Sequence, residues 1–523
     1  MRRIQLYIYP ILFTTLLAGC TGQFEVINKP GYEASEDDLS GDNFKLGMFF
    51  LQLQEYVVPA RTNDYQLAEN LIGSVYARYL MTTKSDWAKS NFSVFHVNDQ
   101  WLNLPFSETM SKFYAPWFQI KQLTQGKGTY YALAQILRVA AMHRLTDLYG
   151  PIPYTRVNGN TLTSPYDSQE TVYRTMLDEL DAAIDTLTLF VSENPAKRPM
   201  IKFDRVYNGD FRKWIYLANS LKLRLAIRIR YADPALARHK AEEVINHPIG
   251  AILSNSDNAA YRCPKQNPLY TIAHIYQDTR VSADILSYMN GYEDPRRAAY
   301  FNTSVIEGLA GYHGLLSGSD YGLDALNLSF STPAAQPADP LIWCTASEVA
   351  FLMAEAALLG WNFPETPQTY YERGIHLSFQ QWNIAGYASY VESDRIPLTY
   401  RDPYGIYNDC GIKSKLTTRW NENTGFEPKL QRIITQKWIA LWPLGQEAWS
   451  EYRRTGYPIL LSIPQYIPIA YKVANRIPFP PAEYQQNSDH ISDALLLLQG
   501  PDDFATRLWW DQKEDKFNFE NKQ

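Results

Sequence analysis

Aromatic side chains stand among amides and carboxylates in the stretch KSDWAKSNFSVFHVNDQW, a combination that suits sugar binding. Trp87, Phe95 and Trp101 supply the rings. The polar neighbours able to form hydrogen bonds are Asn91, Asn98, Asp99 and Gln100. Aromatic rings stack on flat apolar faces such as the C–H side of a sugar, while polar groups beside them fix its orientation. We therefore predict that the three rings contact a ligand; packing within the loop is the alternative.

Two further stretches combine rings with polar loop residues. Tyr312 and Tyr321 lie in GYHGLLSGSDYG, and Trp420 lies in TTRWNENTG. Their Gly, Ser and Asn content is typical of surface loops, so we add these three rings to the predicted ligand-binding residues. Tryptophans on helices with a regular apolar period are assigned to the core instead: Trp214, Trp361, Trp382, Trp438, Trp442 and Trp449.

Charged residues offer little support for catalysis. Glu447 and Glu451 are one helical turn apart, and paired carboxylates are what a glycoside hydrolase needs. Charges at this spacing more often form a solvated or ion-paired helix face. Arg224, Arg228 and Arg230 could bind phosphate, but ion pairs within the scaffold are the favoured interpretation. We predict no catalytic residue and no enzyme activity.

Metal and cofactor motifs are also weak. The chain has no G-x-S-x-G, Walker A, H-E-x-x-H or C-x-x-C sequence, and its histidines are dispersed. Asp320, Asp324 and Asn327 could offer oxygen ligands to Ca²⁺, although they lack EF-hand spacing and a turn-rich loop explains them equally well. No cofactor is predicted, and a calcium site stays open.

The N-terminus predicts a lipid anchor. Arg2 and Arg3 precede an apolar run, residues 4–17, that is shorter than the about 20 residues a spanning helix needs. Ala18 and Gly19 then lead to Cys20, in a pattern similar to a bacterial lipobox. We expect cleavage before Cys20 and acylation of its thiol; the alternative is a signal peptide cut elsewhere.

Composition favours a globular protein, which the predicted anchor would hold at a membrane. The chain has 523 residues, 46% of them hydrophobic and 20% charged, which is enough for a large core. Its net charge of −6 argues against nucleic acid as a partner. Aromatic content is high, with 37 Tyr, 13 Trp and 23 Phe.

Apolar residues at helical spacing predict an all-α dominated fold. The predicted helices form pairs: 129–149 with 170–187, 211–231 with 235–245, 346–361 with 368–382, and 429–441 with 446–454. Alanine-rich pairs of this kind stack as in helical repeats. The helices occupy a scaffold of roughly residues 45–250 and 346–455, with loop-rich insertions at 75–125, 250–345, 384–428 and 456–523. No linker divides residues 20–523, so we predict a single domain after a signal peptide at 1–19.

Several segments, in order and over nearly the whole mature chain, resemble the SusD/RagB family of outer-membrane lipoproteins. They are FEVINKPGYEASEDDL (24–39), RVAAMHRLTDLYGPIPYT (138–155), ASEVAFLMAEAALLGW (346–361), IITQKWIALWPLGQEAWSEYRRTGYP (433–458) and RIPFPPAEYQQNSD (476–489). The resemblance is greatest to the branch called SusD-like, starch-binding associating with outer membrane. It implies four tetratricopeptide-like helix pairs decorated by variable loops.

The resemblance also implies a function. Such a lipoprotein captures an oligosaccharide, or in some members a peptide, and closes as a lid over a TonB-dependent SusC-like transporter in the outer membrane. Thr21–Gln23 lack the acidic character common after the lipid cysteine of surface-exported members. Four hypotheses stay open: capture of glycan, capture of peptide or another nutrient, a surface glycoside hydrolase, and a scaffold that binds only other proteins.

Overall fold

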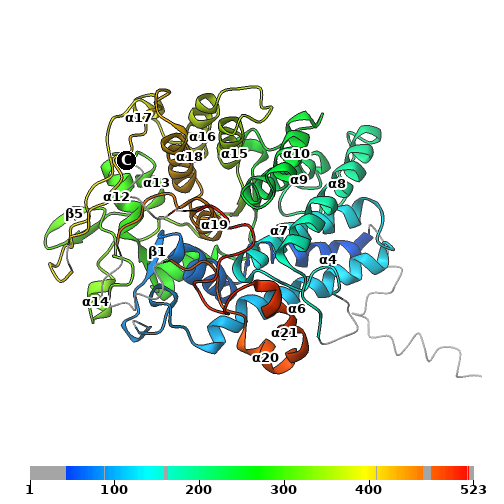
Figure 1. The fold of residues 1–523 in the computed structure, drawn as a ribbon, viewed down its shortest axis with the longest axis horizontal. Helices are drawn as coiled ribbons and strands as arrows, with labels where there is room; N and C mark the ends of the chain where they lie inside the picture. Colours follow the sequence, from blue (N-terminus) through cyan, green and yellow to red (C-terminus); the bar gives the residue numbers. More distant parts are fainter. Residues whose placement is uncertain are drawn as a thin grey trace, which may run out of the picture.

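The structure, a computed structural model, describes residues 43–87, 89–157, 163–407, 409–462, 473–514 and 516. The predicted leader, Cys20 and the 24–39 segment lie outside these residues. Helices dominate the part that is described, and the strands are short (Figure 1). None of the described helices combines the length and the apolar composition needed to cross a membrane.

Every helix predicted from apolar periodicity is present. The helices are α7 (Gly128–Tyr149), α8 (Gln169–Glu193), α9 (Phe211–Arg228), α10 (Pro234–Asn246), α15 (Ala346–Leu358), α16 (Pro367–Gln381), α18 (Phe426–Ala440) and α19 (Gly445–Thr455). α7 packs against α8, α9 against α10 and α15 against α16, as Figure 1 shows. α18 contacts α19, but α19 packs more extensively against η2 (Gln66–Ser74). The number of tetratricopeptide-like pairs therefore stays a prediction.

Local sequence signals set the ends of the first pair. At the start of α8, the Ser168 hydroxyl accepts a hydrogen bond from the backbone N–H of Thr171, the N-cap that its position predicts. α7 stops at Gly150, whose φ of 88° is one that side chains rarely allow. A Cβ at Gly150 would also lie 3.1 Å from Leu508. Pro151 follows and prevents the helix from continuing.

The insertion predicted at 75–125 is not loop throughout, and this part of the prediction is wrong. Residues Asp99–Leu123 form α6, capped by the Asn98 side chain, which accepts from the backbone N–H of Trp101. Pro105 and Pro116 lie inside this helix, and proline normally disfavours one. Burial of its apolar face outweighs that penalty. The buried residues of that face include Phe106, Phe113, Tyr114, Trp117 and Ile120.

Short antiparallel strands join segments that are far apart in the chain. β1 (Leu80–Thr82) pairs with β3 (Thr279–Val281), β2 (Ala259–Tyr261) with β6 (Leu341–Cys344), and β4 (Ser304–Ile306) with β5 (Leu309–Gly311). The β1–β3 pair places Met81 opposite Arg280. It therefore fastens the start of the 75–125 insertion to the 250–345 insertion. Figure 1 shows β1 on the left, whereas α6 from the same insertion lies further to the right.

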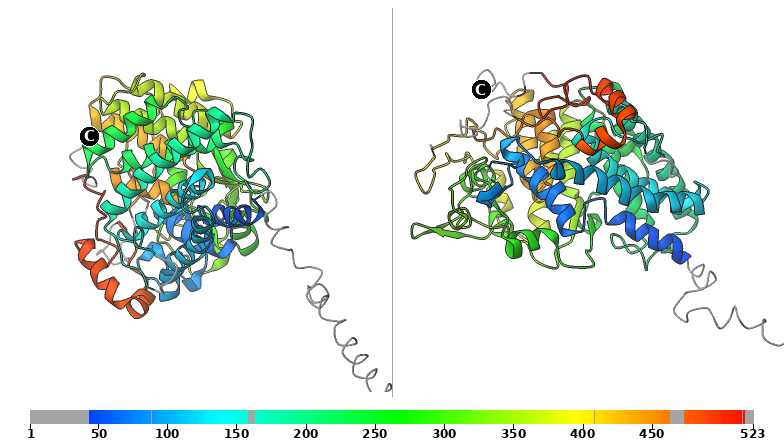
Figure 2. Two further views of the ribbon diagram at one scale, coloured as in Figure 1. Left: turned by 90° about the vertical axis from the view of Figure 1, so that its right-hand side faces the viewer. Right: turned by 90° about the horizontal axis from the view of Figure 1, so that it is seen from below.

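The remaining elements are mostly short. They are α4 (Phe44–Gln54), α5 (Thr62–Tyr65), η3 (Ser85–Trp87), η4 (Phe92–Val94), η5 (Asn255–Asp257), α11 (Pro268–Tyr270), η6 (Thr271–Tyr276), α12 (Ala283–Gly291), α13 (Arg297–Tyr300), α14 (Asp324–Asn327), α17 (Tyr387–Val391), α20 (Pro481–Gln486) and α21 (Ser488–Leu498). Figure 2 shows the C-terminal helices α20 and α21, in orange-red, at the periphery. They belong to the 456–523 insertion, which is thus partly helical.

The segment after α19 returns to the centre of the molecule. The backbone N–H of Ile477 donates to the carbonyl of Leu148 over 2.9 Å, and the Trp510 indole donates to Asp147 over 2.8 Å. Trp510 is completely buried in the same core as α7. The C-terminal segment is therefore packed against α7 of the scaffold.

Candidate functional site

The structure brings Trp87, Phe95 and Trp101 into one half-buried aromatic cluster. The Trp87 and Trp101 rings are perpendicular, with centroids 5.1 Å apart. Phe92 stacks on Trp101 at 6.2 Å, and Phe95 stacks on Tyr76 at 6.1 Å. Contacts of this kind fix ring orientation before any ligand arrives. All three predicted rings remain partly exposed while packing against the main core.

The amides predicted beside these rings divide into two roles. Asn91 is buried and shapes the loop, because its side chain accepts from the N–H of Ser93 and donates to the carbonyl of Trp87 over 2.9 Å. Asn98 caps α6. Asp99 and Gln100 remain exposed next to Trp101. Both side chains are exposed to solvent beside the rings, and a role for them in ligand binding stays a prediction.

Tyr312 lines a small hollow between the 250–345 insertion and residues 398–403. The Arg297 guanidinium lies 4.4 Å from the centroid of the half-buried Tyr312 ring, and Asn290 donates to the Tyr312 carbonyl over 3.2 Å. The hollow has a volume of about 110 Å³, and Asn290, His313 and Arg401 contribute to its lining with Tyr312. It is large enough for little more than a single polar group.

Tyr321 and Trp420 are buried, with 7% of each side chain exposed. The Tyr321 hydroxyl donates to Asp402 over 2.6 Å, and burial raises the pKa of this tyrosine. The Trp420 indole donates to Glu422 over 2.7 Å, and its ring lies 5.2 Å from that of Tyr371. Both rings serve as packing in the described conformation, and a ligand role for either stays a prediction.

The candidate calcium ligands hold two insertions together. Asp324 accepts from the backbone N–H and the hydroxyl of Ser85, over 2.9 and 2.6 Å. The Asn327 amide donates to the Thr83 carbonyl over 3.0 Å, and Asp320 accepts from the N–H of Gly322. These side chains therefore have protein partners. Among the described residues, no group of three or more His, Cys, Asp or Glu side chains is arranged to hold a metal.

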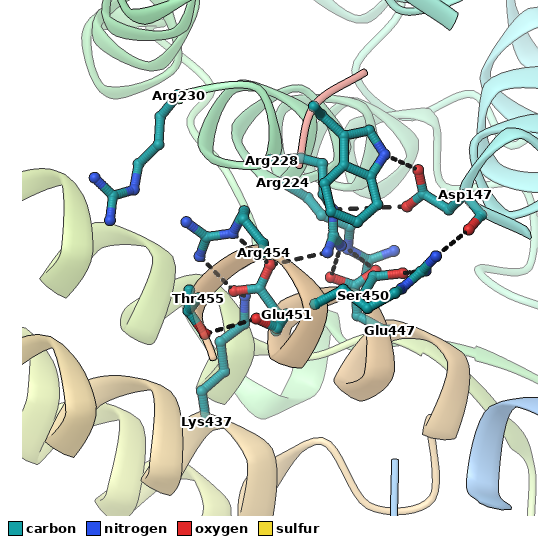
Figure 3. Close-up of polar contacts among 12 residues, drawn as sticks. Asp147, Arg224, Arg228, Arg230, Lys437, Glu447, Ser450, Glu451, Arg454 and Thr455 are labelled. Carbon is teal, nitrogen blue, oxygen red and sulfur yellow. Dashed lines mark hydrogen bonds and ion pairs between the residues drawn. The ribbon is translucent and has the colours of Figure 1, made fainter. Parts of the chain in front are cut away.

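Glu447 and Glu451 belong to a buried network of ion pairs (Figure 3). Glu447 pairs with Arg228, and Glu451 lies 3.0 Å from Arg228, 3.0 Å from Lys437 and 2.7 Å from Arg454. Both carboxylates are at most 3% exposed. A glycoside hydrolase needs carboxylates that flank a substrate. The pair is structural, and the favoured interpretation of ion pairs within the scaffold is confirmed for Arg228.

The same network extends to the other helices of the scaffold. Arg224 pairs with Glu348 over 2.7 Å, and Arg230 pairs with Glu355 over 2.5 Å. Arg454 joins Glu355 to Glu451, as both carboxylates accept from its guanidinium. Four helices, α9, α15, α18 and α19, thus meet through alternating charges. Such a network stabilises only when its members are all paired.

The network predicts acid sensitivity. Burial alone would raise the pKa of Glu447, but Arg228 and Arg224 outweigh it and lower the pKa to about 2. The folded-state value thus lies below the ordinary 4.5, so this carboxylate contributes stability above its ordinary pKa. That contribution disappears as pH falls toward the folded-state value. We expect the midpoint of chemical unfolding to decrease steadily between about pH 4.5 and pH 2; a constant midpoint over this interval would contradict the prediction.

A cavity of about 420 Å³ lies where the sequence predicted only core. Trp382, Tyr300 and Trp442 line it, with Asn383 and Gln381 alongside. Trp382 and Trp361, assigned to the core, pack against it but are only half-buried. The other four helix tryptophans are buried as predicted. Helical periodicity shows which face turns inward but not whether distant segments fill the space in front of it.

The family model for the "Susd and RagB outer membrane lipoprotein" matches residues 26–511. The chain belongs to the SusD-like family. This confirms the family resemblance and places the chain among outer membrane lipoproteins. No protein in the curated set matches the chain.

Solved structures of SusD homologues agree with this family over nearly their full lengths. One from Bacteroides uniformis is 39% identical with a TM-score of 0.85, covering 90% of this chain and 100% of that one. One from Bacteroides thetaiotaomicron is 37% identical with a TM-score of 0.83, covering 90% and 99%. A chitin-binding homologue from Flavobacterium johnsoniae is 35% identical with a TM-score of 0.85, covering 89% and 98%. The helix-dominated SusD-like fold is confirmed.

Proposed function

We propose that this SusD-like protein is a non-catalytic, lipid-anchored protein that captures oligosaccharides at the outer membrane. It delivers them to a TonB-dependent SusC-like transporter, over which it acts as a lid. The observation that most supports this proposal is the likeness to the chitin-binding homologue, which extends over 89% of the chain. The burial of Glu447 and Glu451 in ion pairs supports binding over hydrolysis.

The surface around Trp87 and Trp101 is the proposed glycan contact. Two perpendicular indoles offer one face for stacking and one edge for hydrogen bonding. The exposed Asp99 and Gln100 lie beside them and match the need of a sugar for polar partners. Because the rings are already packed against the core, little order has to be gained on binding.

Replacing Trp87 or Trp101 by alanine should weaken glycan binding about tenfold, equivalent to about 1.4 kcal/mol. The loss comes from the stacked face, while the polar neighbours remain. Isothermal titration calorimetry on the lipoprotein in detergent measures it, and circular dichroism confirms that the variants are folded. Trp361→Ala is the matched control, because Trp361 is another half-buried indole, on the scaffold outside this cluster. Unchanged affinity in both variants would exclude this surface.

Peptide is the second candidate cargo, since aromatic loops bind apolar side chains as readily as sugars. A glycan array and a peptide library, probed in parallel with the same lipoprotein, distinguish the two. Binding to related oligosaccharides, with no reducing sugar released on incubation, supports the proposal. Binding to peptides alone would show that the cargo is peptide. Release of reducing sugar would contradict the non-catalytic role.

A further inference from the structure

The cavity beside Trp382 is a built aromatic pocket rather than a packing defect. Its wall is a continuous cluster of rings, in which the Tyr300 ring meets that of Trp382 edge-to-face at 4.9 Å and stacks on that of Trp442 at 6.1 Å. Phe301 supports Trp442 from another side at 4.9 Å. Tyr300 and Trp442 are buried and Trp382 is half-buried, so one indole remains open in front of a fixed wall.

Small residues keep the space in front of this wall empty. Ala299, Ala334, Ala335, Pro340 and Pro443 line the cavity. They come from separate segments: α13, the stretch that leads into β6, and the turn between α18 and α19. A volume of about 420 Å³ lies within the range of about 300–1,000 Å³ usual for small-molecule sites. A short saccharide therefore fits by size.

Polar side chains stand beside the aromatic wall, since Asn267, Gln381 and Asn383 line the cavity with Trp382. The Gln381 Oε1 and Trp382 Nε1 atoms are themselves covered by protein atoms. The exposed amide of Asn383 is the accessible polar group among the three, and an amide both donates and accepts. A hydroxyl-bearing ligand can pair with it, whereas a purely apolar occupant would leave it without a partner.

Charge selects the kind of saccharide. Asp339 is the one charged side chain among the described residues that line the cavity. It accepts from the backbone N–H of Gln336 over 2.8 Å, and the exposed Asn383 lines the same cavity. No arginine or lysine of these lining residues is available to pair with a sulfate or a uronate. An anionic sugar would therefore meet a carboxylate without a compensating cation.

We propose that this cavity, bounded by Trp382, Tyr300 and Asp339, is a second binding site that accepts the end of a neutral oligosaccharide. It shares no lining residue with the Trp87–Trp101 surface. The inference rests on the proposed function, as it takes the cargo to be a glycan. The two sites together bind one oligosaccharide class at separate places on the protein.

Calorimetry with neutral disaccharides, including N,N′-diacetylchitobiose, cellobiose and maltose, tests the cavity on the full lipoprotein in detergent. The double variant Trp87→Ala/Trp101→Ala should retain binding of at least one of them. Adding Ala335→Trp, which fills the cavity, should weaken that remaining binding at least about tenfold. Ala196→Trp, at an exposed loop position outside the lining, is the matched control and should change nothing.

A gentler variant covers the risk that Ala335→Trp does not fold. Trp382→Phe keeps an aromatic ring in the wall but reduces the face available for stacking, and should reduce affinity several-fold. The cavity is excluded if neither variant changes binding, or if the double tryptophan variant binds no sugar; the proposed function stands in both cases because the unmodified lipoprotein still binds. If the unmodified lipoprotein binds none of these neutral disaccharides, the cavity proposal is overturned, while the glycan array still decides the proposed function.

Discussion

Glu451→Ala is expected to destabilise the protein by about 3–5 kcal/mol, the usual result of removing one partner from a buried ion pair. Glu451 is 2% exposed and accepts from Arg454 while pairing with Lys437 and Arg228. Without it, Lys437 loses the carboxylate that faces it in a fully buried position. Denaturant unfolding followed by tryptophan fluorescence measures the change.

A surface pair provides the matched control for this substitution. Glu170 and Arg174 are one helical turn apart on α8 and about half exposed, so Glu170→Ala should cost no more than about 0.5 kcal/mol. Glu451→Gln, which keeps the shape and removes the charge, provides a second measurement if the alanine variant is insoluble. Equal stability losses at Glu451 and Glu170 would show that burial of the network has no special energetic role.

Cys20→Ser should move the protein from the membrane fraction to the soluble fraction. The predicted anchor depends on a thiol that receives acyl chains, and serine offers no such thiol. Each buried CH₂ contributes about 0.8 kcal/mol, so several chains on one residue hold the protein firmly. No described helix provides an alternative span. Cell fractionation with immunodetection, together with metabolic labelling by a fatty acid, measures the effect.

Thr21→Ser is the matched control for the anchor. It changes the neighbouring residue, leaves the thiol in place and should leave both labelling and fractionation unchanged. Membrane retention of an exported Cys20→Ser variant would contradict the lipid anchor. Retention only in the presence of the transporter would instead assign the membrane association to that partner.

Much of the scaffold could be predicted because its helices carry strong apolar periods and recognisable ends. Ser168 and Gly150 set the boundaries of the first pair, as their positions predict. α6 escaped prediction because Pro105 and Pro116 argue locally against a helix, and only tertiary burial overrides them. The strands were not predicted for a similar reason. β1 is only three residues long, and its partner β3 lies about two hundred positions away in the sequence.

The candidate site was predictable only where the signal was local. Trp87 and Trp101 stand in one polar stretch, and the structure brings them together. Trp382 directly follows a helix with a regular apolar period, and the cavity that it lines is completed by residues of other segments, such as Ala335. The charges around Glu451 are equally non-local, because a sequence shows the charges but not which of them meet.

The hydrogen bond between Trp510 and Asp147 joins positions 363 residues apart, which has a consequence for the order of synthesis. This part of the core cannot close before Trp510 has been made, since the indole of Trp510 is completely buried in it. Contacts of this range form late and slowly. A chain that has not yet reached Trp510 therefore lacks the contacts that complete the core around α7.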